Sequence, residues 1–136
     1  MPSANRTVDT TLCDGRHFSI APDAQVDFTA LPFPDNSFPL VVFDPPHLRQ
    51  AGSTGWLSVK YGVLPDNWQD ILRQGFEECF RVLVPFGTLV FKWSEDQVRL
   101  RDVLSLTDRS PLFGNRRGKT IWVVFQNDRM DCHEAV

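Results

Sequence analysis

The segment Asp44-Pro45-Pro46-His47 combines a carboxylate, a rigid turn and an imidazole directly after an apolar run. Residues 40–43 are Leu-Val-Val-Phe, the continuous pattern of a strand that is buried on both faces of a parallel sheet. The two prolines fix φ and remove backbone donors, which leaves the carbonyl oxygens of Asp44 and Pro45 free to accept hydrogen bonds. Open α/β sheets bind ligands at the carboxyl ends of their strands. The turn therefore predicts a site for a hydrogen-bond donor such as an amine.

These residues resemble motif IV of the class I methyltransferases that use S-adenosylmethionine (SAM), in the branch that modifies amino or ring nitrogens. The family pattern is Asp/Asn-Pro-Pro-aromatic, and His47 stands here in place of the aromatic residue. Residues 27–38 are similar to the segment where an acidic residue meets the cofactor adenine and the chain enters the fourth strand. Residues 76–91 are similar to the family's helix, Pro-Gly-Gly turn and fifth strand. The three matches keep the family's order and cover about half of the chain.

The resemblance implies an α/β fold, a Rossmann-like methyltransferase sheet with a C-terminal antiparallel strand pair, and SAM as the cofactor. It assigns residues 44–47 to catalysis, in which the Asp44 carboxylate and the Pro45 carbonyl accept hydrogen bonds from the two N–H groups of the amine that receives the methyl group. It places Asp27 and Phe28, together with Asp44, at the cofactor. Since the sulfonium methyl is already electrophilic, positioning the nitrogen outweighs acid–base work.

The family's first elements are not recognisable. Such enzymes begin with a strand, an acidic and glycine-rich loop and a helix that hold the methionine part of SAM, whereas no Gly-x-Gly occurs in this sequence. Only about 24 residues precede the expected strand that carries Asp27. Three explanations stay open: N-terminal truncation, a partner that supplies the missing half, or loss of catalysis. Because the remaining segments keep the family's order, we expect truncation.

Composition fits a single partial domain. The 136 residues are 42% hydrophobic, enough for a core, and a formal net charge of −3 argues against nucleic-acid binding through bulk electrostatics. Cys13, Cys79 and Cys132 lack CxxC spacing, so neither a disulfide framework nor a metal site is expected. No apolar run has the length of a membrane span or the place of a secretory signal, so we expect a cytoplasmic protein without a membrane partner.

The expected domain covers residues 11–127, between a disordered N-terminus (1–10) and a C-terminal tail (128–136). Periodicity and turn residues predict its elements. They are a hairpin over 11–20, strands over 25–29, 40–43 and 88–91, helices over 66–83 and 95–106, and an antiparallel pair over 110–113 and 120–126 joined by 114–118.

A long loop over 48–65 carries three candidate substrate residues, Trp56, Lys60 and Tyr61. Loops of this length are usually functional. The two aromatic side chains form either a lid over the substrate or anchors that hold the loop to the core.

The other candidates each have a structural alternative. Lys92 and Trp93 follow a buried strand at its carboxyl edge, where they contact the substrate or simply end a solvated strand. Asp44 could cap its own turn, and Asp27 could form an Asx turn. His47 could be held by its turn instead of stacking on a substrate ring.

The sequence therefore predicts a SAM-dependent methyltransferase, or a fragment of one, that acts on an amino or ring nitrogen, with DNA and RNA bases among the candidate acceptors. Two other functions stay open: a catalytically inactive methyltransferase-like domain that binds a partner or oligomerises, and a small-molecule methyltransferase. Absence of the leading strands would expose a sheet edge, through which we expect a homo-oligomer to form.

Overall fold

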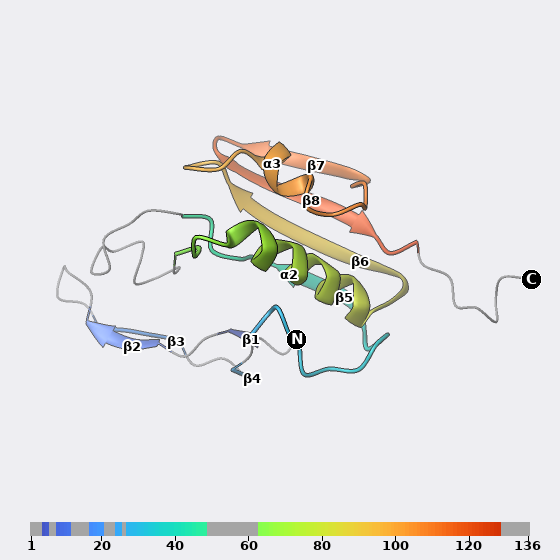
Figure 1. Ribbon diagram of the computed structural model, residues 1–136, viewed down its shortest axis with the longest axis horizontal. Helices are drawn as coiled ribbons and strands as arrows, with labels where there is room; N and C mark the ends of the chain where they lie inside the picture. The colour runs from blue at the N-terminus through green and yellow to red at the C-terminus, as the bar shows by residue number, and fades with distance from the viewer. Residues whose placement is uncertain are drawn as a thin grey trace, which may run out of the picture.

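The computed structural model describes residues 27–48 and 63–128 in full, together with the backbone of four short strands near the N-terminus. Those strands are β1 (Ala4–Asn5), β2 (Val8–Thr11), β3 (His17–Ile20) and β4 (Ala24–Gln25). They lie outside the main sheet (Figure 1) and form two small sheets. In one of them β1 runs parallel to β4, and in the other β2 runs antiparallel to β3.

The N-terminal predictions hold only in part. The hairpin expected over 11–20 is confirmed as the pairing of β2 with β3, although its first strand lies further toward the N-terminus than expected. Strand β1 and most of β2 fall within residues 1–10, which the sequence predicts to be disordered. Of the strand expected over 25–29, only Gln25 lies in a described strand, at the end of β4; the last part is wrong, because the Ala30 N–H donates to the Asp27 carbonyl at 3.1 Å and closes a turn there.

The main sheet has four strands in the spatial order β5-β6-β8-β7. β5 and β6 are parallel, and the other two neighbouring pairs are antiparallel. The strands expected over 40–43, 88–91 and 120–126 are therefore confirmed, the first two within longer strands. The observed bounds are β5 Phe38–Phe43, β6 Leu83–Ser94, β7 Phe113–Arg117 and β8 Thr120–Gln126.

The first strand of the final antiparallel pair lies later than expected. The sequence places it over 110–113 with a loop over 114–118, whereas β7 extends to Arg117, which pairs with Thr120. The connection can be this short because Gly118 has a φ of 62°, a left-handed conformation that glycine adopts without steric cost. Most of the expected loop is therefore strand.

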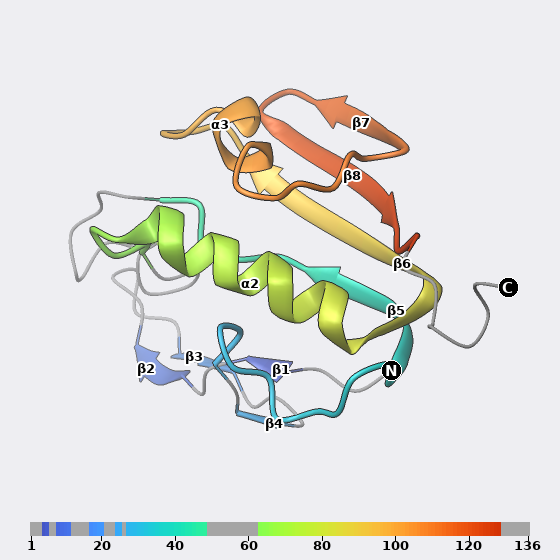
Figure 2. The ribbon, with the colours of Figure 1, turned by 45° about the vertical axis from the view of Figure 1, so that its right-hand side comes forward.

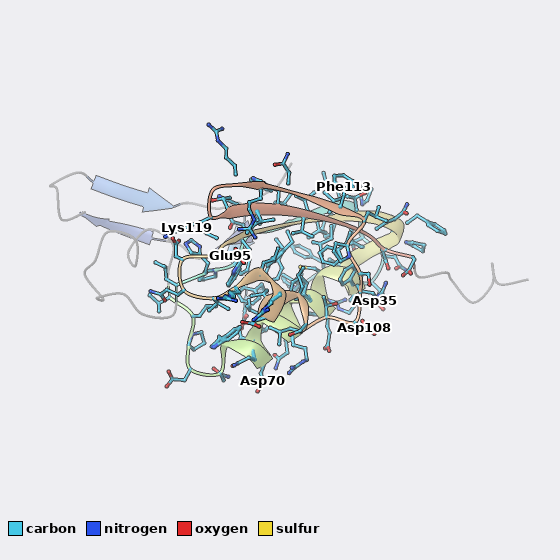
Figure 3. The ribbon with its side chains drawn as sticks, turned by 90° about the horizontal axis from the view of Figure 1, so that it is seen from above. Asp35, Asp70, Glu95, Asp108, Phe113 and Lys119 are labelled. Atoms are coloured by element: carbon cyan, nitrogen blue, oxygen red, sulfur yellow. The ribbon has the colours of Figure 1, made fainter. Side chains whose placement is uncertain are left out.

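Both described helices lie on one face of this sheet (Figures 2 and 3). The helix expected over 66–83 is confirmed as α2 (Trp68–Val82), which turns its buried side chains toward β5 and β6. Phe76 is fully buried there, with its ring 5.6 Å from that of Phe43 and 4.9 Å from that of Phe91. Neither described helix is long and apolar enough to cross a membrane.

The second helix, α3 (Leu100–Leu104), is shorter than the helix expected over 95–106. The residues before it form a turn that two side chains hold: Trp93 Nε1 donates to the Val98 carbonyl at 2.9 Å, and the Glu95 carboxylate accepts the Leu100 N–H at 2.6 Å. These bonds keep the chain out of a helix until residue 100.

The opposite face of the sheet is covered by no described helix, and we call it the open face. Alternate residues of each strand point to it. The expectation that residues 40–43 are buried on both sides is wrong for this part of the chain, since Leu40 is 37% and Val42 49% exposed. By strand register, the open face comprises Leu40 and Val42; Thr88, Val90, Lys92 and Ser94; Thr120, Trp122, Val124 and Gln126; and Phe113, Asn115 and Arg117.

Arg81, near the end of α2, fastens the segment that leads into β5. Its guanidinium donates to the backbone carbonyls of Leu31 at 3.0 Å and Phe33 at 2.9 Å, and to the Asp35 carboxylate at 2.7 Å. Its Nε also donates to Glu78 at 2.6 Å, and Glu78 accepts the Leu31 N–H at 2.8 Å. A single side chain of α2 thus attaches residues 31–35, which precede β5, to the helix.

The start of β6 contains a residue in an unfavourable conformation. Phe86 has a φ of 63°, a left-handed backbone conformation that is unfavourable for phenylalanine. The residue is 56% exposed, so burial of its ring offsets little of this cost. Two backbone hydrogen bonds to the buried Asn127 maintain the conformation: the Phe86 N–H donates to the Asn127 carbonyl at 2.5 Å, and the Asn127 N–H donates to the Gly87 carbonyl at 2.8 Å.

We expect Phe86→Asn to raise the free energy of unfolding by about 0.5–1 kcal/mol, because asparagine adopts the left-handed region at a lower cost than phenylalanine. Urea denaturation followed by circular dichroism measures the change. Phe113→Asn is the control, since Phe113 is a similarly exposed aromatic residue without a positive φ. A gain in both variants would mean that removing an exposed ring, not relieving the backbone, is responsible.

Candidate functional site

The carboxyl ends of β5 and β6 meet the beginning of β8, because β8 runs antiparallel to β6. Asp44 follows β5 directly, Lys92 and Ser94 are among the last three residues of β6, and Thr120 is the first residue of β8. Together with His47 they line a cavity of about 210 Å³. Two of the candidates from the sequence motif, Asp44 and His47, thus share one cavity with Lys92.

Asp44 presents its carboxylate to solvent at this cavity. The side chain is 52% exposed, and one carboxylate oxygen lies 3.8 Å from Lys92 Nζ. Among the described residues no backbone N–H donates to it, so the turn-capping alternative has no hydrogen bond in its favour here. Pro45 is buried and Pro46 is half-buried, which holds the turn rigidly against the sheet.

His47 has more contacts within the protein than Asp44 and is less exposed. Its Nε2 lies 3.2 Å from an Asp96 carboxylate oxygen, and its ring meets the edge of Trp93 at a centroid distance of 6.3 Å. Its side chain is only 17% exposed. The imidazole therefore forms part of the cavity wall with a fixed orientation.

Asp27 forms the Asx turn that was the alternative to a cofactor contact. Its Oδ1 accepts the Thr29 N–H at 2.9 Å and the Thr29 hydroxyl at 2.7 Å. These two bonds, the hydroxyl bond first, hold the pKa of Asp27 below its usual value. The second oxygen, Oδ2, accepts no hydrogen bond from the described residues, so an ionised acceptor for an adenine amino group is still available.

Phe28 anchors Asp27 to the core. Its ring lies 5.3 Å from that of Phe43, edge to face. A Cβ at Gly75 of α2 would lie 2.8 Å from the Phe28 ring, so only glycine permits this approach of the helix. The side chain therefore packs inside the domain, and its contact with a cofactor remains a prediction.

Trp93 does not face the cavity, so the expected substrate contact has no geometric basis. The residue is 1% exposed, stacks on Phe91 at 6.0 Å and satisfies its indole N–H within the turn before α3. The strand alternation explains this, since Trp93 points to the helix face and Lys92 to the open face. Trp56, Lys60 and Tyr61 lie outside the described residues.

Three residues that motif reasoning missed lie at the cavity or beside it: Ser94, Thr120 and Trp122. The alternation of residues 120–126 is a signal that Thr120 and Trp122 share a face. Which strand they meet follows only from the register of β8 with β6, which local sequence does not encode.

Two other kinds of site, a metal centre and a reactive thiol, are not found among the described residues. No group of three or more His, Cys, Asp or Glu side chains among them is arranged to hold a metal ion. Burial raises the pKa of the Cys79 thiol to about 12, which leaves it protonated and unreactive. A larger cavity of about 560 Å³ lies between α2 and residues 105–109, and none of the residues nominated from sequence lines it.

No protein-family model matches this sequence, and no match was found among curated proteins. Among solved structures, the chain is similar to a crystal structure described as that of a "putative methyltransferase" from Pseudomonas syringae, with a TM-score of 0.45 and 16% sequence identity. The match covers 76% of this chain and 55% of that one, so this chain spans little more than half of that structure. A likeness at this level leaves the function to be argued from the residues themselves.

Proposed function

We propose that this chain is a SAM-dependent methyltransferase, or a part of one, that transfers a methyl group to an amino or ring nitrogen. The observation that carries the proposal is the placement of Asp44. Asp44 lies between the end of β5 and the Pro45-Pro46 turn, and its carboxylate stands exposed at a cavity and accepts no hydrogen bond from the described backbone. The parallel pair β5–β6 followed by the antiparallel hairpin β7–β8 also agrees with the motif order read from the sequence.

The residues of the cavity would orient the acceptor rather than activate it chemically. The Asp44 carboxylate and the Pro45 carbonyl would accept hydrogen bonds from the N–H groups of the amine, which would orient the nitrogen lone pair toward the methyl group. His47, fixed by Asp96, forms the wall that limits the size of the acceptor. The proton that the acceptor nitrogen gives up on methylation would leave to solvent at the exposed side of the cavity, where the Asp44 side chain is 52% exposed.

Asp27 is the residue that we propose for the cofactor. Its Oδ1 accepts two hydrogen bonds from Thr29, and its Oδ2 would accept a hydrogen bond from the amino group of the SAM adenine. SAM supplies the electrophilic methyl group when it is bound. The ring of Phe28, packed on Phe43 and against Gly75 in the middle of α2, would fix the position of Asp27.

A second candidate function is a catalytically silent domain that binds a partner or a second copy of the chain. The exposed Leu40 and Val42 favour it, because these apolar side chains lie on the open face. β5 adds to this, since it pairs with a described strand on one side only.

Calorimetric titration of SAM tests the proposed function. We expect binding to the wild-type chain and at least a tenfold loss of affinity in Asp27→Ala, as removal of a charged hydrogen-bond acceptor costs about 1.5–3 kcal/mol. Asp27→Asn is the sharper variant, because its Oδ1 keeps both Thr29 bonds while an amide NH₂ replaces Oδ2. Asp108→Ala, whose side chain is 97% exposed and distant from the site, is the matched control.

The outcomes bear on the role of Asp27 and on the choice between the two candidate functions. Equal affinity in the wild type and Asp27→Asn would remove Asp27 from the cofactor site. No binding of SAM at all, combined with a stable dimer in sedimentation, would overturn the methyltransferase proposal for this chain in favour of the binding domain.

A further inference from the structure

One row of side chains crosses the open face where β5 and β6 end. Asp44 comes level with Lys92, because the residues immediately before them are register partners. Lys92 is opposite Trp122 on β8, and Trp122 is opposite Asn115 on β7. Residues that are directly paired across strands project on the same face. A carboxylate, an ammonium, an indole and an amide therefore stand side by side.

Trp122 is the aromatic member of this row, and it is 43% exposed. Lys92 Nζ lies 5.5 Å from the indole centroid and 3.8 Å from an Asp44 carboxylate oxygen. The carboxylate oxygen is therefore no further from the indole centroid than these two distances together, about 9 Å. A ring stacked on the indole could direct an exocyclic amine toward Asp44, since one hydrogen bond of about 2.9 Å spans part of that distance.

The charges around the row favour an anion. Three carboxylates near it are each paired with a cation: Asp44 with Lys92, Asp96 with Lys119 and Glu95 with Arg116. Figure 3 shows Glu95 and Lys119 close together at this end of the sheet. Arg117 adds a further cation that pairs with no described carboxylate, and it shares the open face with Trp122, one diagonal position away. This positive end lies in a chain whose formal net charge is −3.

We propose that the methyl acceptor is an amino-bearing aromatic ring that carries an anionic group. Its ring would stack on Trp122, its amine would point along the row to Asp44, and its phosphate or carboxylate would meet Arg117, with Lys92 moving off the indole as the ring arrives. The proposal deepens the proposed function and rests on it for the methyl transfer, while the binding of the ring depends only on the open face.

Titration calorimetry without SAM tests the binding site. Cytidine 5′-monophosphate and 4-aminobenzoate are the probes, since each has a ring, an amine and an anionic group, phosphate in one and carboxylate in the other. Cytidine and aniline are their uncharged counterparts. None of them contains the adenine of SAM, so a cofactor site cannot account for their binding.

We expect at least one anionic probe to bind about tenfold more tightly than its uncharged counterpart. Trp122→Thr should weaken that probe at least about tenfold, in the range of base stacking on aromatic side chains. Arg117→Gln should weaken the anionic probe about fivefold and leave the uncharged counterpart unchanged. Phe86→Asn is the control, because Phe86 is an exposed aromatic residue near the start of β6, at the other end of that strand from Lys92.

The identity of the probe that binds distinguishes a phosphate-bearing from a carboxylate-bearing acceptor. Failure of both anionic probes to bind, equal binding of charged and uncharged probes, or an unchanged affinity in Trp122→Thr would overturn the proposal. The result is separable from that of the proposed function, since SAM binding should be the same in Trp122→Thr as in the wild type. That titration, with equal unfolding midpoints, also shows that the variant is folded.

Discussion

Asp44→Asn should lower the rate of methyl transfer about 100-fold. The amide keeps the shape of the side chain but replaces one acceptor oxygen with a donor, which opposes the N–H group of the acceptor. Loss of one positioned polar group in an active site typically costs about 10²–10³ in rate. The carboxylate can have this effect because it stands exposed at the cavity with Lys92 as its described partner.

Transfer of a labelled methyl group from SAM to a panel of acceptors measures this rate. The panel holds single-stranded DNA, single-stranded RNA, cytidine 5′-monophosphate and 4-aminobenzoate. Asp66→Asn is the control, since Asp66 is an exposed carboxylate before α2 that lies outside the cavity. Activity in Asp44→Asn equal to that of the control would show that Asp44 does no more than end a strand.

Local patterns account for the elements that face the core. The apolar runs at 40–43 and 88–91 and the helical spacing of α2 predict the sheet pair and its covering helix, because burial imposes these periods directly. The errors arise where two local signals compete. Gly114 and Gly118 both read as turn residues, yet only Gly118 has a positive φ, so the hairpin is tighter than expected.

In the candidate site, too, some residues can be predicted from local sequence and others depend on strand pairing. The Asp-Pro-Pro turn carries its own backbone constraint, so Asp44 and His47 are predictable from their sequence neighbours alone. Trp122 belongs to the row only because β8 inserts between β6 and β7, a pairing between segments far apart in the chain. The exposure of Val42 likewise depends on which layers surround the sheet, and an apolar run gives no information about that.

Arg81→Met should lower the free energy of unfolding by about 3 kcal/mol at pH 7. Methionine keeps the apolar length of the side chain but removes the hydrogen bonds that the guanidinium donates to the segment before β5, and it leaves Glu78 half-buried without its cation. Breaking a buried ion pair by removing one partner costs about 3–5 kcal/mol, and the 30% exposure of Arg81 places this pair at the low end. Urea denaturation at pH 7 measures the loss.

The pH dependence gives this prediction a second, independent readout. Hydrogen bonding to Arg81 is the main reason that the pKa of Glu78 lies below its usual value of 4.5, so folding favours the ionised carboxylate. The stability that the pair contributes is present above about pH 4.5 and is lost as the pH falls through the lowered pKa. The difference between wild type and Arg81→Met should therefore shrink at pH 3.

Arg73→Met on the same helix is the matched control for this effect. Arg73 also pairs with an acid three residues away, Asp70 at 2.9 Å, but both side chains are well exposed and neither binds the segment before β5. Exposed pairs of this kind contribute about 0.3–0.5 kcal/mol. Equal losses in the two variants would mean that Arg81 acts as an ordinary surface charge. A loss confined to Arg81→Met would show that the hydrogen bonds from Arg81 to Leu31, Phe33 and Asp35 stabilise the attachment of the segment before β5 to α2.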